Sequence, residues 1–282
     1  MDKAIQIAYN GLFRLKCELA REAGFRHIAV NYTEILGKSE SDWERITEDI
    51  QKVLDRCGLR CVQTHPHYYD LRLSSEIRDE EMEKNIKRSI ASSSAIGAEY
   101  CVIHPRTSVS SGYRVSVSFE DNKRWLSELL DCAVTHGTKI AVENLPIFPS
   151  DKGAMPFYSS GFEDLGILVD YFNDPDMAIC WDFGHANMMI WDQAVAIRHL
   201  AGRIRCTHVH NNFAIKDNHS TPDEGNIDWP RVMAAVRDIG YTGPLTLETH
   251  CRYVEEGMLR SFARHNFGCL EYLERLIEGS KE

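Results

Sequence analysis

The sequence lacks the features that would place it in a membrane or outside the cell. No apolar run among its 282 residues is long enough to span a bilayer. The stretch MDKAIQIAYNG, with which it begins, has no signal-peptide pattern. The nine cysteines are an odd number and have no paired spacing, which argues against a disulfide framework and predicts reduced, buried thiols. We therefore expect a cytoplasmic protein with no membrane partner.

Positive charge is also scarce. There are 32 Lys and Arg residues against 42 Asp and Glu residues, so the formal net charge is −10. Such a chain repels polyanions as a whole, which favours a small molecule over a nucleic acid as substrate. No linker-like segment divides the chain. The length therefore allows a single large domain over residues 1–282.

Eight short apolar runs alternate with stretches of helical periodicity. One helical stripe consists of Trp43, Ile46, Ile50, Val53 and Leu54, and the pair Ser41 and Glu44 has capping-box spacing near its start. The alternation predicts an α/β fold, a single (β/α)8 TIM barrel. The expected strands are residues 4–9, 27–32, 61–65, 100–104, 139–143, 177–182, 204–210 and 244–248.

The last four of these runs each end in a side chain that can bind a metal ion. The carboxyl ends of barrel strands share one rim, so the four groups should converge there. Carboxylate oxygens and imidazole nitrogens suit Mn, Mg, Co or Zn, and two glutamates can also transfer protons. We therefore predict a divalent metal as cofactor. Its predicted ligands are Glu143, Asp182, His210 and Glu248, with Glu143 and Glu248 also catalytic.

Further candidates for binding substrate or a second metal lie on the same rim. His65 and His104 end the third and fourth runs, and His185 comes three residues after Asp182. An Asp-x-His pair, Asp217 and His219, follows on the next loop. His208 alternates with His210 along one run, and we expect it to point away from the barrel axis and not to bind the metal.

Long polar loops follow the strands rather than the helices, over residues 66–78, 105–117, 144–161 and 211–227. These loops exceed a simple connection and can cover a small ligand. Cations on loops of the same rim are candidates to hold a phosphate or carboxylate tail. They are Arg106, Lys216 and Arg252.

Taken in order, the motifs HPHYYDL, VIHPR, AVENLP, CWDFGHA, HVHNN, DNHSTPDEGNIDW and GYTGPLTLE resemble the xylose isomerase-like barrels. This superfamily of sugar isomerases and epimerases also contains DNA-repair enzymes of the endonuclease IV type. The resemblance implies that Glu143, Asp182, His210 and Glu248 are metal ligands. It also implies that His185 contacts substrate or a further metal.

The resemblance implies a metal-dependent isomerase or epimerase of a sugar, sugar phosphate or polyol, working by proton transfer through a metal-stabilised enediolate. Its alternatives are a zinc-dependent phosphodiesterase of the endonuclease IV type and a dehydratase of the keto-inositol type. A carbohydrate-binding barrel without catalysis is a further reading. The oligomeric state stays open, although relatives are often dimers or tetramers. Pro149 and Lys216 stand where the best-studied ketose 3-epimerases carry a glutamate and an arginine.

Overall fold

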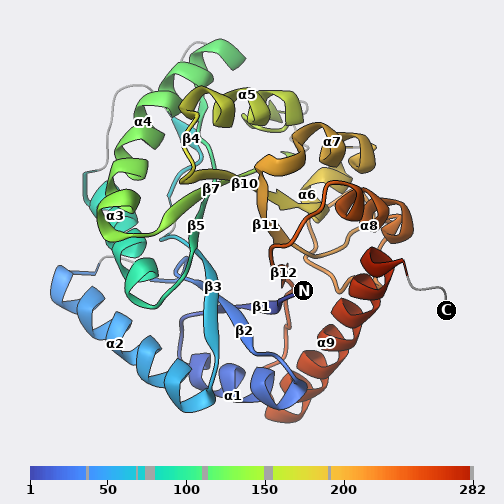
Figure 1. Ribbon diagram of the computed structural model, residues 1–282. Helices are drawn as coiled ribbons and strands as arrows, with labels where there is room; N and C mark the ends of the chain where they lie inside the picture. Colours follow the sequence, from blue (N-terminus) through green and yellow to red (C-terminus); the bar gives the residue numbers. More distant parts are fainter. Residues whose placement is uncertain are drawn as a thin grey trace.

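The computed structural model describes residues 1–35, 38–67, 69–73, 80–109, 114–148, 155–189 and 192–279. Eight strands form one parallel sheet in the order β11-β10-β7-β5-β3-β2-β1-β12. The two outermost strands of this order approach each other through a parallel bridge between Val209 and Leu247, so that the sheet is a nearly closed barrel inside a ring of helices (Figure 1). The predicted (β/α)8 barrel is confirmed.

The barrel strands fall on the eight predicted runs and differ from them by one or two residues at the ends. They are β1 (Lys3–Ala8), β2 (His27–Asn31), β3 (Arg60–His65), β5 (Tyr100–Ile103), β7 (Lys139–Glu143), β10 (Met177–Asp182), β11 (Ile204–His208) and β12 (Leu245–Leu247). Two short pairs lie in the predicted loops. They join β4 (Arg72–Leu73) to β6 (Thr107–Ser108) and β8 (Ile147–Phe148) to β9 (Met155–Pro156). Other parts of these loops, residues 68, 74–79, 110–113 and 149–154, lie outside the described residues.

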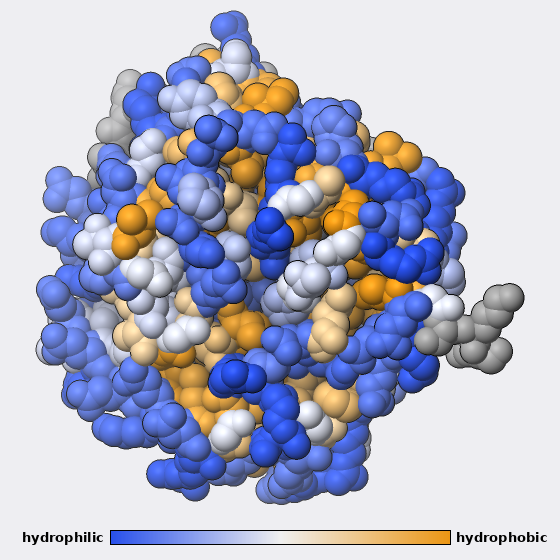
Figure 2. All heavy atoms as spheres, viewed as in Figure 1, coloured by the Kyte–Doolittle hydropathy of each residue, from blue (hydrophilic) through white to orange (hydrophobic). Residues whose placement is uncertain are grey.

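Helices cover the outside of the barrel. They are α1 (Phe13–Ala23), α2 (Glu40–Cys57), α3 (Glu80–Ala95), α4 (Val115–His136), α5 (Phe162–Phe172), α6 (Phe183–Met188), α7 (Gln193–Leu200), α8 (Trp229–Asp238) and α9 (Glu256–Glu278). Hydrophilic residues dominate the circumference in Figure 2, and apolar residues show mainly between them. This is the distribution expected of amphipathic helices on a sheet.

Helix α2 illustrates how the sequence sets an element. Its predicted apolar stripe is buried against the barrel: Trp43, Ile46, Ile50, Val53 and Leu54. The helix begins two residues earlier than the cap we predicted at Ser41 and Glu44. Its capping box is instead Ser39 with Asp42, since the Ser39 hydroxyl accepts from the Asp42 amide and the Asp42 carboxylate accepts from the Ser39 amide.

The inside of the barrel holds a small cluster that sets the direction of the rim side chains. It consists of Tyr100, Val102, Ala141, Ala178, Cys180 and Cys206. Side chains two residues apart on a strand point to the same face. The next inward positions on β7, β10 and β11 are therefore Glu143, Asp182 and His208. The barrel thus brings these three groups to one end of its axis.

All nine cysteines are free, as their spacing predicted. Within the part of the chain that the structure describes, none of the helices has the length and apolar character needed to cross a bilayer.

Candidate metal centre

A buried group of three acids and one histidine lies at the carboxyl ends of the strands. Glu143 and Asp182 are the last residues of β7 and β10, His208 is the last of β11, and Glu248 follows β12 directly. His208 Nδ1 lies 3.1 Å from Glu143 Oε1, 3.2 Å from Glu248 Oε2 and 3.8 Å from Asp182 Oδ2. One ligand atom from each of the four lies within 4.8 Å of the others. We call this set the axial group.

Our prediction that His208 points away from the axis is wrong. Cys206 lies inside the barrel, and His208 follows it by two residues on the same strand, so both face inward. His210 follows by two more and stays on the same side, but it lies beyond the end of β11. His208 therefore takes the place among the acids that we had given to His210.

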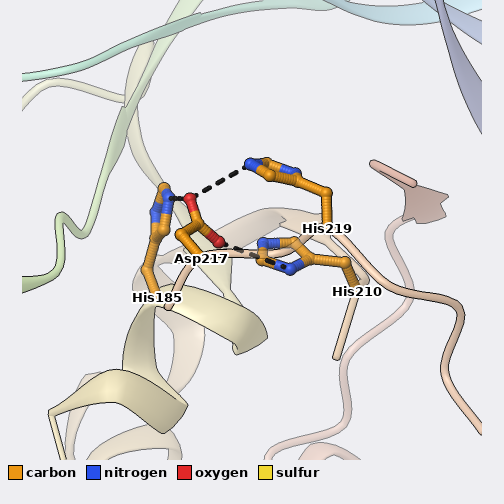
Figure 3. Close-up of side chains that lie close together, drawn as sticks. All are labelled: His185, His210, Asp217 and His219. Carbon is orange, nitrogen blue, oxygen red and sulfur yellow. Dashed lines mark ion pairs between the residues drawn. The ribbon is translucent and has the colours of Figure 1, made fainter. Parts of the chain in front are cut away.

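His210 belongs to a second group, which we call the lateral group. Asp217 Oδ2 lies 3.3 Å from His185 Nε2 and 3.1 Å from His219 Nε2, and Asp217 Oδ1 lies 3.8 Å from His210 Nδ1. Figure 3 shows the Asp217 carboxylate between the three rings. Asp182 links the two groups, because its Oδ1 lies 3.0 Å from His210 Nε2. The predicted residues His185, Asp217 and His219 thus do come together.

A third group joins the two remaining predicted histidines to the axial group. His104 Nε2 lies 3.0 Å from Glu143 Oε2, and His65 Nε2 lies 4.0 Å from the same oxygen. The two Nε2 atoms are 3.3 Å apart. Glu143 is therefore shared between the axial group and this histidine pair.

Backbone carbonyls orient two of the rings in the way that metal-binding histidines are usually oriented. His185 Nδ1 lies 2.9 Å from the carbonyl of Asn144, and His219 Nδ1 lies 2.8 Å from the carbonyl of Glu248. If Nδ1 donates in each case, Nε2 is left with its lone pair toward Asp217. Gln6 Nε2 donates to Glu248 Oε1 at 2.6 Å and holds that carboxylate in place.

The donor atoms fit a divalent cation. Several are buried and make no hydrogen bond within the described part of the chain, including both carboxylate oxygens of Glu143, both ring nitrogens of His208, His210 Nδ1 and Asp217 Oδ1. Buried polar atoms in this state are rare unless something else satisfies them. Oxygen and imidazole nitrogen are ligands for Mg, Mn, Co or Zn. The axial and lateral groups are therefore the residues that would hold such an ion.

The acids raise the proton affinity of the histidines around them. Burial lowers the pKa of His208, but Glu143 and Glu248 outweigh it and raise this pKa to about 10. In the same way burial opposes the hydrogen bond to Asp217, which helps to raise the pKa of His219 to about 9. Burial raises the pKa of Glu248, yet His208 and His219 bring it down to about 2. The rim therefore demands positive charge, supplied by protons or by a cation.

Metal binding at this rim is expected to weaken as the pH falls. A cation needs unprotonated imidazole nitrogen, whereas pKa values of about 10 for His208 and about 9 for His219 keep both rings protonated at neutral pH without a cation. Binding then expels protons, and affinity should drop about tenfold per pH unit for each proton expelled. Calorimetric titration with Mn²⁺ in buffers of different ionisation enthalpy measures this. Constant affinity between about pH 6 and 8 without proton release would contradict it.

Gly184 is packed against the ring of His210. A Cβ at this position would overlap the imidazole, and the Gly184 carbonyl accepts from Asn212 Nδ2 at 2.9 Å, which fixes the local backbone. Gly184→Ala should therefore displace His210 and lower metal affinity about 10–100-fold. The measurement is Mn²⁺ titration beside Gly202→Ala, where a Cβ meets nothing within 4 Å. Equal affinities in the two variants would refute the assignment of His210.

A cavity of about 540 Å³ opens onto the rim. On the side of the metal groups it is lined by His65, His104, His185, Asp217, His219 and Glu248. Across from them it is lined by Lys16, Asn31, Thr33 and Glu34, none of which we predicted, because β1 and β2 end in no metal-capable side chain. A larger cavity of about 1070 Å³ lies at the opposite end of the strands, near Asp2, Arg60 and Lys139, and contains none of the predicted residues.

The predicted anion-binding cations do not line this cavity. Arg106 is buried elsewhere, where its Nη1 lies 2.7 Å from Glu83 Oε1 and its guanidinium lies 4.3 Å from the centre of the Trp125 ring. Its prediction as an anion ligand is wrong, because a buried arginine takes its counter-ion from its own core. Lys216 and Arg252 are exposed and stay predictions. The cation beside the cavity is Lys16.

Sequence reasoning also missed His250. Its ring stacks on that of His219 with centroids 4.3 Å apart, and its amide donates to the His219 carbonyl at 3.1 Å. Burial, followed by the charge of His219, lowers the pKa of His250. His250 comes two residues after Glu248, which is the one signal that could have drawn attention to it.

Fold and site together define a class: a (β/α)8 barrel with metal-capable groups at the carboxyl-end rim. The family model described as xylose isomerase-like TIM barrel matches residues 17–266, and the chain belongs to this family.

Individual relatives are more distant. The uncharacterized protein y4fM of Sinorhizobium fredii is 24% identical over 271 residues, which cover 87% of this chain and 84% of the relative. A structure described as a D-tagatose 3-epimerase-like protein superposes with a TM-score of 0.74 at 20% identity, covering 98% of both chains. That of a D-psicose 3-epimerase in the presence of D-fructose gives 0.73 at 15%, covering 98% of this chain and 99% of the other. At these identities the structural likeness shows the fold.

Proposed function

We propose that the protein is a divalent-metal-dependent isomerase or epimerase of a sugar or sugar derivative. The observation that carries the proposal is the axial group, whose Glu248 faces a cavity of about 540 Å³ lined almost throughout by polar side chains. This volume lies in the range of small-molecule sites. Similarity to structures described as sugar 3-epimerases supports the same substrate class.

The axial group would hold the principal cation through Glu143, Asp182, His208 and Glu248, with His210 beside it. A divalent cation in this place supplies the positive charge that makes a C–H bond next to a carbonyl acidic and that stabilises the resulting anion. The low pKa of Glu248, about 2, keeps its carboxylate ionised and able to take part at neutral pH.

The two glutamates differ in their access to the cavity. Glu248 lines it, and Gln6 holds one of its oxygens at 2.6 Å. Glu143 is fully buried behind His104 and His208. Glu248 is therefore the group placed to take a proton from a substrate carbon. Glu143 would hold the charge balance and, through His104, pass a proton to or from the other side of the substrate.

The remaining lining residues suit a ligand rich in hydroxyl groups. His65, His104 and His185 offer ring nitrogens on one side, and Asn31 and Thr33 offer an amide and a hydroxyl on the other. A small number of convergent polar groups fixes the orientation of a small ligand and makes the site selective. Return of the proton to the same carbon gives epimerisation, and its return to the neighbouring carbon gives isomerisation.

The test is a screen of aldoses, ketoses, their phosphates and keto-inositols with metal-loaded protein in deuterated water. An isomerase or epimerase leaves deuterium at carbon in a product of otherwise unchanged mass. A dehydratase gives a product that has lost water. Failure of every sugar to exchange a carbon-bound proton, with the metal shown to be bound, would refute the proposal.

A zinc-dependent phosphodiesterase is the second candidate, because three metal-capable groups adjoin one another at the rim. One zinc ion per group, together with incision of an abasic DNA duplex, would favour this function over the first. The formal net charge of −10 weighs against a polyanionic substrate.

A further inference from the structure

A second kind of metal-capable cluster lies on the outside of the barrel. His265 and Cys269 are four residues apart on α9, so their side chains share one face of the helix. Asp223 reaches them from the loop between β11 and α8. His265 Nε2 lies 2.9 Å from Asp223 Oδ1, Cys269 Sγ lies 3.6 Å from the same oxygen, and Sγ lies 3.7 Å from His265 Nε2. This cluster shares no residue with the groups at the rim.

From this arrangement we propose that Asp223, His265 and Cys269 form a zinc-binding site on the outer surface, with a fourth position open to solvent. Typical zinc bond lengths in tetrahedral geometry place nitrogen, oxygen and sulfur ligands about 3.3–3.6 Å from one another. The three observed separations, 2.9, 3.6 and 3.7 Å, bracket that range. A thiolate beside imidazole and carboxylate favours zinc over magnesium or calcium.

The geometry also separates a metal site from a nucleophilic triad. In a triad, the base contacts the nucleophile through one ring nitrogen and the acid through the other. Here the same atom, His265 Nε2, faces both Asp223 and Cys269. Burial and the neighbouring Asp223 raise the pKa of the Cys269 thiol to about 12, so without a cation the sulfur is no ready nucleophile. Three donor atoms facing one point is the arrangement of ligands.

The loop that carries Asp223 is held in place before any ion binds. The carbonyl of Pro222 accepts from Trp229 Nε1 at 2.7 Å and from Asn211 Nδ2 at 2.8 Å. Asn211 and Ser220 also exchange two backbone hydrogen bonds, of 3.0 and 3.1 Å. The Asp223 carboxylate is thus presented to α9 from a fixed backbone, which lowers the ordering cost of binding.

The open position has a neighbourhood suited to an exchangeable ligand. A cavity of about 360 Å³ beside the cluster is lined by Trp229, Arg264 and Tyr272 as well as by the three ligands. Water fills the fourth place in zinc sites with three protein ligands. Zinc binding replaces the Cys269 S–H bond by a sulfur–zinc bond and releases the proton to solvent. The ion would also fasten to α9 the loop that carries Asp217 and His219.

Zinc content by elemental analysis and absorption of the Co²⁺-substituted protein test this site. The parent protein should carry one equivalent more than Cys269→Ser and His265→Asn, and should show a near-ultraviolet thiolate-to-cobalt band that both variants lose. Cys57→Ser is the matched control, because Cys57 is half-buried on α2 and belongs to no metal-capable group in the described chain. It should keep both signals.

Equal zinc content and an equal cobalt band in the parent, Cys269→Ser and His265→Asn would show that the cluster is only a surface ion pair with a nearby thiol. Loss of both signals in Cys57→Ser as well would also overturn the proposal, since the loss would not be specific to the cluster. The readout is metal content and absorption, so its outcome is independent of the sugar-exchange activity proposed above.

Discussion

Glu248→Gln should slow exchange of the carbon-bound proton of the substrate with solvent by about 10²–10⁴-fold, the usual contribution of a positioned acid–base group. Gln keeps the size of the side chain, and its amide oxygen can still accept from Gln6 Nε2, which now donates at 2.6 Å. The change therefore removes a carboxylate that lines the cavity while leaving its position. Deuterium incorporation followed by mass spectrometry gives the rate.

Glu224→Gln is the matched control, because Glu224 is exposed on the loop between β11 and α8. Its exchange rate should equal that of the parent. Because Glu248 is also a predicted ligand, metal content must be measured in both variants, and Glu248→Gln should be assayed with saturating metal. An unchanged exchange rate in fully loaded Glu248→Gln would remove the acid–base role from this residue.

Arg106→Met should destabilise the fold by about 3–5 kcal/mol, which is the cost of leaving a buried charge without its partner. The guanidinium and the Glu83 carboxylate are both buried and 2.7 Å apart. Glu83 also accepts from Trp125 Nε1 at 3.0 Å, so the carboxylate links α3 to α4 behind the barrel. Urea denaturation followed by circular dichroism measures the free energy of unfolding.

Two comparisons make this result specific. Glu83→Gln combined with Arg106→Met removes both charges and keeps an acceptor for Trp125, so it should recover much of the lost stability. Arg124→Met breaks an exposed ion pair with Asp121 and should cost less than about 1 kcal/mol. If Arg106→Met costs no more than Arg124→Met, Arg106 has no structural role and its assignment reopens.

The predicted site shows where reasoning from the sequence succeeds. Glu143, Asp182 and Glu248 were identified because acids that end parallel strands meet at one rim whatever the loops do. His208 was misplaced by an error in counting the strand alternation, since residues two apart share a face. The sequence contained the correct answer, and Cys206 inside the barrel supplies the phase.

Other parts of the site depended on contacts that no local pattern reveals. Arg106 follows a strand-end histidine and has the composition of an anion site, yet Glu83 and Trp125, 23 and 19 positions away in the sequence, take up its charge and its flat face. Lys16 and Asn31 line the cavity only because β1 and β2 close the barrel beside β12 and β3. Their own segments carry no feature that marks them as functional.

By itself, the sequence determined the alternation of strands and helices, the (β/α)8 barrel and the rim at which acids and histidines collect, because these follow from hydrophobic period and from the shared direction of parallel strands. Only the tertiary structure decided how the rim residues divide into axial and lateral groups, and that Asp223 meets His265 and Cys269 across 42 and 46 positions of chain. The reason is that ligand groups are defined by separations of about 3 Å, which depend on where loops and helices pack and not on spacing along the chain.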